Sequence, residues 1–273
     1  MDLVITADDL GIDARRDDGI FEALAAGAVT QASLLVAGPS GRTAAERVRR
    51  EGWSVGLHLD LTETPAVAAD VPSLVDARGR KLGKHGLRRA IARGAVDVTH
   101  VAREAEAQIA LFSSRIGRPP VHVDGHQHVH VLPELTETLA SVFRDAGVKS
   151  TRIPEQSPVD AEPFYRRVSE DAHAARTVYA RQGIASTEAF VGLDRMGAAS
   201  DGERLAEAVR AHAVLRSVEV MTHPGHVGSG WDDFNESPVR EHELAVLLAR
   251  PFAKLVAGGV ASLSSFRTLA GRA

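Results

Sequence analysis

Short apolar runs alternate with amphipathic segments along this chain, and this alternation constrains the fold more than any other feature. The apolar runs are rich in β-branched residues and are typical of strands, as in DLVITADD at 2–9 and SVGLHLDLT at 54–62. Segments with helical spacing follow them, such as GRTAAERVRREG at 41–52. The order predicts βα units around a parallel sheet. Further strands are expected at 29–38, 120–124, 148–154, 217–225 and 260–266, and further helices at 17–28, 99–117, 133–146 and 239–259.

The chain is expected to form a single domain over 1–273. Its 273 residues are enough for one large α/β domain with a full core, and no convincing linker divides them. Residues 65–99 contain scattered proline and glycine, so we interpret them as an inserted lid or substrate loop. Residues 155–200 show little periodicity, and no element is assigned to them.

The composition limits the partners and the chemistry. The formal net charge of -4 gives no general attraction to nucleic acid or anionic membranes. No apolar stretch approaches the roughly 20 residues of a membrane span, and the N-terminus lacks the features of a secretion signal. A cytoplasmic protein is therefore expected, with a homodimer left open. Because the chain has no cysteine, any metal site must use histidine and carboxylate ligands.

Ionisable residues stand where the predicted strands end. The stretch VHVDGHQHVH at 121–130 alone holds four of the 12 histidines. The carboxyl ends of parallel strands meet at one edge of a sheet or barrel, so residues far apart in sequence are expected to form one composite site there. The strand-end residues are Asp8, Asp9, His58, Asp60, Asp124, His126, Arg152 and His223.

These residue types suit a divalent metal. A cation that activates water needs roughly three protein ligands and an open position, and Asp9, His58 and His126 would supply one oxygen and two imidazoles. Asp8 would then be free to act as a base, because adjacent carboxylates on an extended chain point in different directions. Arg152 can keep such an aspartate ionised and oriented by a charge-assisted pair.

The histidine-rich stretch is not expected to supply several ligands. Gly125 is well placed to break the extended run, so Asp124 would end the strand as a partner behind the metal ligands. His126 would then be the single ligand from this stretch, and His128 a candidate for the substrate side. The two remaining histidines, His122 and His130, are expected to be structural.

With these residues in place, the chain resembles the YdjC-like carbohydrate deacetylases. The matching stretches are ITADDLG at 5–11, VGLHLDLT at 55–62, HVDGHQHVH at 122–130 and THPG at 222–225, in the order of the family. Weaker similarity extends the resemblance over nearly the whole chain. It implies a distorted (β/α) barrel, TIM-barrel-like and related to the polysaccharide deacetylases, with an Asp-His-His metal site.

On the matching positions, the resemblance implies that Asp9, His58 and His126 are the metal ligands and that Asp8 is the base. His223 would lie near the leaving amine. Asp60 departs from the pattern, because many relatives carry asparagine there; the change could alter substrate contacts but leaves the ligand assignment untouched.

The implied reaction is hydrolysis of an acetamide on an N-acetylated sugar, such as a short chitooligosaccharide. Water activated by the metal and deprotonated by Asp8 would attack the acetyl carbonyl, and His223 or His128 would protonate the amine. Two imidazole ligands suit Zn²⁺, whereas the resembled family is commonly described with Mg²⁺. Aromatic residues are only 4% of the chain, which favours a short saccharide or a glycosyl-bearing small molecule over a long polysaccharide. The tryptophans and tyrosines are Trp53, Trp231, Tyr165 and Tyr179.

Alternatives remain open from the sequence. Asp8 and Asp9 could cap the following helix, His58 could be a core residue, and Arg152 could belong to a structural ion pair. The chain could also be another metallohydrolase, of the amidohydrolase or phosphoesterase type, or a non-catalytic protein that binds a metal or a sugar. An amidohydrolase would place an H-x-H pair on the first strand, and a binding protein would not need Asp8 beside Asp9.

Overall fold

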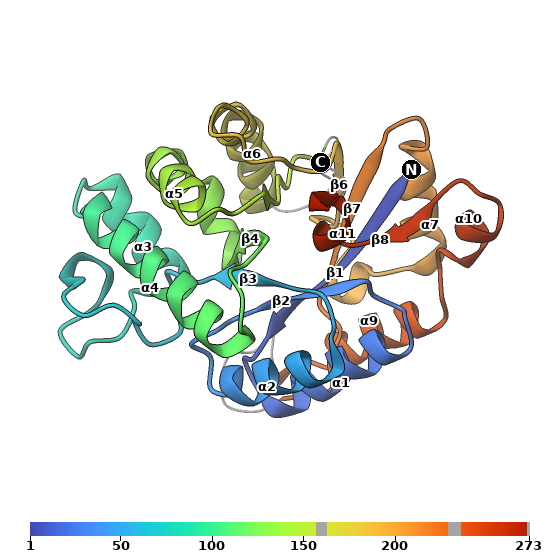
Figure 1. Cartoon of the computed structure of the whole chain (residues 1–273), viewed down its shortest axis with the longest axis horizontal. Helices are drawn as coiled ribbons and strands as arrows, with labels where there is room; N and C mark the ends of the chain where they lie inside the picture. The colour runs from blue at the N-terminus through green and yellow to red at the C-terminus, as the bar shows by residue number, and fades with distance from the viewer. Residues whose placement is uncertain (157–162, 229–235, 272–273) are drawn as a thin grey trace.

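The computed structural model describes residues 1–156, 163–228 and 236–271. Its strands form one parallel sheet that is curved into a half-barrel, with helices packed around the outside (Figure 1). This arrangement confirms the predicted distorted (β/α) barrel. The strands are β1 (Asp2–Leu10), β2 (Gln31–Leu34), β3 (Val55–Leu59), β4 (His122–Gly125), β5 (Ser150–Thr151), β6 (Ala189–Val191), β7 (Ser217–Thr222) and β8 (Ser262–Ser264).

Helices connect the strands and cover the sheet. The α-helices are α1 (Ala14–Ala25), α2 (Gly41–Glu51), α3 (Gly83–Ala92), α4 (Val98–Ile116), α5 (Pro133–Asp145), α6 (Pro163–Arg181), α7 (Gly202–Ala211), α9 (Val239–Leu248), α10 (Ala253–Ala257) and α11 (Phe266–Ala270). Among the described residues, the 3₁₀ segments are η1 (Pro72–Leu74), η2 (His126–Val131) and η3 (Gly197–Ala199). Within the described ranges, no helix is long and apolar enough to cross a membrane.

The strand order is β5-β4-β3-β2-β1-β7-β6, so β1 lies in the middle. All the pairings are parallel, and β1 pairs with β7 over Asp2–Ala7. It pairs with β8 over its first residues and with β2 from Thr6 onward. Since every carboxyl end points the same way, residues that follow β1, β3, β4 and β7 reach one end of the half-barrel.

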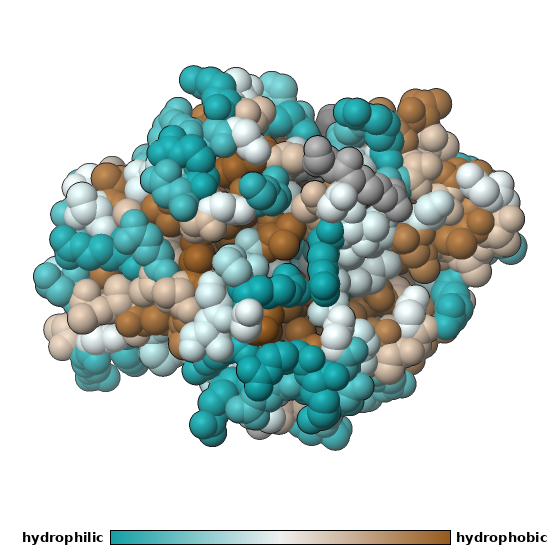
Figure 2. Space-filling view, viewed as in Figure 1, coloured by the Kyte–Doolittle hydropathy of each residue, from teal (hydrophilic) through white to brown (hydrophobic). Residues whose placement is uncertain are grey.

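Apolar side chains explain the packing of these elements. The strands of the sheet are almost entirely buried, as is expected where helices cover a parallel sheet. One hydrophobic core runs from Leu3 in β1 to Ala261 beside β8. On the outside, hydrophilic side chains cover most of the face in Figure 2, and hydrophobic groups gather near α10 and β8.

Two stretches are more regular than the sequence indicates. The excursion at 65–99 contains η1 and the ten-residue helix α3, of which only Leu87 is buried. The unassigned stretch 155–200 contains β6 and the 19-residue helix α6. Helix α6 was not predicted because its buried face holds two alanines and Asp171 alongside Val168 and Tyr179, and these residues give a weak hydrophobic period.

Candidate active site

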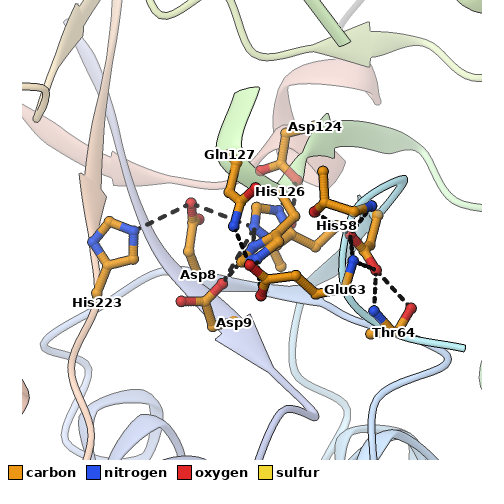
Figure 3. A network of polar contacts seen from close by, with 12 residues as sticks. Asp8, Asp9, His58, Glu63, Thr64, Asp124, His126, Gln127 and His223 are labelled. Atoms are coloured by element: carbon orange, nitrogen blue, oxygen red, sulfur yellow. Dashed lines mark hydrogen bonds and ion pairs between the residues drawn. The ribbon is translucent and has the colours of Figure 1, made fainter. Parts of the chain in front are cut away.

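A cavity of about 1120 Å³ opens at the carboxyl end of the sheet. Of the strand-end residues predicted for the composite site, the cavity is lined by Asp8, Asp9, His58, His126 and His223 (Figure 3). The other three, Asp60, Asp124 and Arg152, are not among its lining residues. Strand β1 supplies Asp8 and Asp9, β3 supplies His58, and the segments after β4 and β7 supply His126 and His223. The cavity is also lined by Arg16, Glu63, Gln127, His128, Met196, Met221 and Arg240, and by Lys84, His85, Arg89, Phe164 and Tyr165 nearer its mouth in α3 and α6.

A bulge in β1 aims both aspartates at the cavity. The register between β1 and β2 shifts between Ala7 and Leu10, and Asp9 has φ +66°, a left-handed conformation that non-glycine residues rarely adopt. His58 Nε2 consequently lies 3.5 Å from Asp9 Oδ1 and 3.9 Å from Asp8 Oδ2. The argument that the two carboxylates point apart on an extended chain is therefore wrong, because the chain is not extended at Asp9.

Three atoms form a triangle with the dimensions of a metal site. Asp9 Oδ1 lies 3.5 Å from His58 Nε2 and 3.0 Å from His126 Nδ1, and the two nitrogens are 3.4 Å apart. Ligand atoms about 2.1 Å from one cation, at angles of roughly 90 to 109°, would be about 3.0 to 3.4 Å from one another. Asp9 Oδ1 is buried and accepts no hydrogen bond from the described residues. The triangle therefore fits a divalent cation.

Asp124 fixes the orientation of the His58 ring. It lies on β4 beside His58, whose Nδ1 donates to Asp124 Oδ1 over 2.7 Å. With the proton on Nδ1, the lone pair of Nε2 faces the triangle. Ser33 also donates to Asp124 Oδ1, and Arg152 Nη2 lies 3.0 Å from Oδ2. Asp124 thus lies behind His58, on the side of the ring away from the triangle.

Asp8 is held by Arg152 and not by the helix that follows β1. Arg152 Nη1 and Nη2 donate to the two oxygens of Asp8 over 2.6 and 2.7 Å, while its Nε donates to Glu219 over 3.0 Å. The cap of α1 is Asp13, so neither Asp8 nor Asp9 caps that helix. Burial raises the pKa of Asp8, and the charge of Arg152 opposes the rise.

The two histidines of the triangle are strongly basic without a cation. Burial lowers the pKa of His58, but Asp124 and Asp8 outweigh it and raise that pKa to about 9. His126 likewise has a pKa well above its ordinary value, because contact with Asp9 outweighs burial. Burial raises the pKa of Asp9, yet contact with His126 holds it well below the ordinary value. The electrostatics of the pocket thus favour positive charge at the triangle.

The chain turns sharply after β4. Gly125 is extended and still belongs to the strand, and the break comes at Gln127 and His128, with φ +54° and +59°. The extended run thus ends at Gly125, as predicted, but Gly125 is itself extended, and the left-handed residues come two and three positions later. A side chain at Gly125 would lie 2.6 Å from His130 Nδ1, so glycine is required for a close approach.

The other three histidines of this stretch lie in two environments: His122 and His130 are packed inside the protein, and His128 lines the cavity. His130 is buried and donates from Nε2 to the carbonyl of Arg152 over 2.8 Å, and His122 stacks on Phe266 with ring centroids 3.6 Å apart. Both therefore lie in packing positions, as expected. His128 lines the cavity. Burial, and then the charge of Arg152, lower the pKa of His128 well below its ordinary value, which keeps this imidazole neutral.

Asp60 lies in a turn beside the site and is not among the cavity-lining residues. Its carboxylate accepts the backbone N–H groups of Thr62 and Thr64 over 2.7 and 2.6 Å. Burial raises its pKa, but Lys81 and His126 hold the pKa well below the ordinary value. This position favours a role in shaping the turn that carries Glu63 over a direct contact with substrate.

Comparison of the chain with models of protein families identifies the family to which it belongs. The model of the YdjC-like protein family matches residues 2–258, which is almost the whole chain. The chain belongs to the YdjC-like family. The resemblance that the four motifs indicate is thereby confirmed.

Individual relatives of this YdjC-like chain are consistent with that membership. The human carbohydrate deacetylase is 41% identical, with 91% of this chain and 85% of the relative covered. The chitooligosaccharide deacetylase of Serratia marcescens is 30% identical, with 98% of each covered. A solved structure of a candidate cellobiose-phosphate cleavage protein from Enterococcus faecalis V583 has a TM-score of 0.81 at 23% identity, covering 98% of both chains. That structure supports the fold of this YdjC-like chain.

Several residues of this YdjC-like site were not found from the sequence. Glu63 directly follows the predicted strand at 54–62, so the rule that site residues stand at strand ends would have named it as a candidate. Glu219 is an acid inside the apolar run SVEVMT, which is itself a signal of a buried partner. Arg240 Nη2 lies 3.3 Å from Asp9 Oδ2, but it comes from α9 and no local pattern marks it. Burial, and then Arg16, lower the pKa of Arg240 to about 9.

Proposed function

We propose that this chain is a metal-dependent deacetylase that hydrolyses the acetamide of a short N-acetylated sugar. The observation that carries the proposal is the triangle of Asp9, His58 and His126 with the separate carboxylate of Asp8 beside it. The relatives named as carbohydrate and chitooligosaccharide deacetylases support the reaction and the substrate class.

A divalent cation held by the triangle would polarise the acetyl carbonyl and make a water molecule more acidic. The donors, one carboxylate and two imidazoles, suit Zn²⁺ and other transition metals, whereas Mg²⁺ prefers oxygen ligands. His58 and His126 present opposite ring nitrogens to the cation, so each must carry its proton on the other nitrogen.

Asp8 takes the proton from the attacking water. Its Oδ2 lies 3.9 Å from both His58 Nε2 and His223 Nε2, which sets it between the metal ligands and His223. Arg152 engages one lone pair on each oxygen and leaves the other available. Since burial raises the pKa of Asp8, this carboxylate is a stronger proton acceptor than an exposed aspartate.

His223 gives a proton to the departing amine. It lines the cavity on the far side of Asp8 from the triangle (Figure 3), and its backbone N–H donates to Glu243 over 2.8 Å. His128 is the alternative acid, but its lowered pKa makes it a poor proton donor at neutral pH. The proposal therefore assigns the acid to His223.

The cavity favours a short saccharide. Tyr165 lines the cavity and can offer an apolar ring face to a sugar, whereas the ring of the neighbouring Phe164 is covered by Lys84 at 3.7 Å. Among the other aromatic candidates, Trp53 stacks on Phe21 away from the cavity, Tyr179 is buried with its hydroxyl bonded to His130, and Trp231 lies outside the described residues. The segment 65–99 contributes α3 to the same mouth, which supports its proposed role as a substrate loop.

Acetate release from N-acetylated mono-, di- and trisaccharides tests the proposal. Activity should disappear on chelation and return with Zn²⁺ or Mg²⁺, and the more effective ion identifies the metal. Asp8→Asn should lower turnover by about 10² to 10⁴-fold while metal binding persists. Unchanged turnover in Asp8→Asn would remove Asp8 as the base, and metal binding without acetate release from any substrate would favour a binding protein.

A further inference from the structure

Glu63 is a residue of the cavity wall to which the proposed chemistry assigns no role. It follows β3 and lines the cavity beside His126. Its Oε2 lies 3.2 Å from His126 Nε2, the ring nitrogen that points away from the metal triangle. We propose that Glu63 is the positioning residue of His126: it accepts the Nε2 proton and thereby aims the Nδ1 lone pair at the metal. This inference rests on the proposed metal site.

The argument begins with the two nitrogens of His126. Nδ1 faces Asp9 and His58 in the triangle, and a nitrogen that binds a metal must be unprotonated. The proton of the neutral ring must then be on Nε2, where an acceptor stabilises that tautomer. Glu63 Oε2 is in place to accept it. The same logic holds at His58, where Asp124 accepts the proton of Nδ1 and leaves Nε2 for the metal.

Glu63 is itself held in position from both sides. Gln127 Nε2 donates to Glu63 Oε1 over 2.5 Å. On the other side, the backbone N–H of Glu63 donates to Asp60 over 3.1 Å. Gln127 stands directly after His126 in the strained turn that follows β4. Glu63 therefore ties the turn after β3 to the turn after β4 that carries His126.

A buried polar network fixes the turn that carries Glu63. Lys81 donates to the carbonyl of Asp60 over 2.7 Å and pairs with Glu104 over 3.0 Å. Gln108 donates to the same carbonyl over 2.6 Å. These side chains are buried, and they come from the 65–99 stretch and from α4. The network gives Asp60 a role through Glu63 and explains why an acid at that position need not touch substrate.

The geometry argues against Glu63 as a direct ligand. Among the described residues, the group of close ligand atoms at this point consists of Asp9, His58 and His126, without Glu63. The Glu63 side chain is 22% exposed, in contrast to 3% for His58 and 5% for Asp9. Glu63 thus lies behind the ring of His126 and acts through it.

Zinc affinity of the metal-free protein, measured by competition with a chromophoric chelator, tests this role without any substrate. Glu63→Ala should bind Zn²⁺ about 10 to 100-fold more weakly, as is usual when the partner of a ligating histidine is lost. Glu63→Gln retains an acceptor oxygen and should recover part of the loss. Glu137→Gln, on the exposed side of α5, removes the same charge far from the contact and should leave affinity unchanged.

A second readout separates positioning from a general effect on folding. In the zinc-bound protein, imidazole ¹⁵N spectra should show the His126 Nε2 proton in hydrogen-bonded form, and Glu63→Gln should shift that signal while leaving the His58 signals in place. Equal zinc affinity in Glu63→Ala, Glu63→Gln and the unsubstituted protein would overturn the role of Glu63 and leave the metal site standing. Failure of the unsubstituted protein to bind either Zn²⁺ or Mg²⁺ would overturn both.

Discussion

Replacing Arg152 with methionine removes a fully buried guanidinium that contacts three carboxylates. It lies 2.6 Å from Asp8, 3.0 Å from Asp124 and 2.9 Å from Glu219. Removing one partner of a buried ion pair costs about 3 to 5 kcal/mol, because the other partner remains buried and uncompensated. Methionine fills much of the arginine volume, so the cost is mainly electrostatic. We expect the free energy of unfolding at pH 7 to fall by about 3 to 5 kcal/mol.

The loss of stability in Arg152→Met should depend on pH in a direction that follows from the pKa of Asp124. Burial raises the pKa of Asp124, but Arg152 and His58 hold it well below its ordinary value of 3.8. A carboxyl with a lowered folded-state pKa stabilises the fold above its unfolded pKa, and this contribution is lost as the pH falls through the folded value. Loss of Arg152 raises the folded pKa of Asp124. The stability difference between the two proteins should therefore be largest near neutral pH and should shrink as the pH falls toward about 4.

Urea unfolding of the metal-free protein between about pH 4 and pH 8 measures both effects. Arg144→Met is the matched control, because Arg144 pairs with Asp145 at the surface with 48% of its side chain exposed, and the expected change is below about 1 kcal/mol. Arg152→Lys retains one charge without the two-pronged contact and should fall between the two. A loss below about 1 kcal/mol in Arg152→Met at pH 7 would refute the ion-pair reasoning.

Three further outcomes follow from the site. Burial lowers the pKa of His58, but Asp124 and Asp8 outweigh it and raise that pKa from 6.5 to about 9. Between pH 6.5 and about pH 9, the melting temperature of the metal-free protein should therefore fall, and its zinc affinity should rise as His58 loses its proton. A zinc affinity that does not change with pH would contradict this. Gly125→Ala should cost about 1 to 3 kcal/mol in urea unfolding, whereas Gly271→Ala, with its nearest contact at 3.6 Å, should have little effect; equal losses would contradict the close approach. Tyr165→Ala should raise KM for a short N-acetylated sugar about 2 to 10-fold with little change in kcat, and an unchanged KM would remove Tyr165 from the sugar site.

The positions of the site residues were predictable because they depend on a simple rule of parallel sheets. Asp9, His58 and His126 each follow an apolar run, and the carboxyl ends of such runs converge. The same rule places His223 at the site after β7. The rule predicts at which end of the sheet each side chain lies, and it does so without any information on the loop structures.

The directions of the side chains were not predictable in the same way. The β1 bulge puts Asp9 at φ +66° and turns it toward the side of Asp8, and no glycine or proline marks it. Gln127 and His128 adopt left-handed conformations that glycine normally supplies. Such strain persists only where the surrounding structure enforces it, and that enforcement comes from contacts far away in the sequence, including the one between Glu63 and Gln127.

The proposed cation would account for both the strain and the charges of the site. If the cluster were a structural network of ion pairs, the protons on His58 and His126 would neutralise it, and Asp9 Oδ1 would accept one of them in a well-aligned bond. Instead, Asp9 Oδ1 accepts no hydrogen bond from the described residues although His126 Nδ1 is 3.0 Å away. Left-handed backbone at Asp9 and His128 costs about 1 to 3 kcal/mol at each position. A cation at the triangle would replace both protons, engage the oxygen and offset that strain.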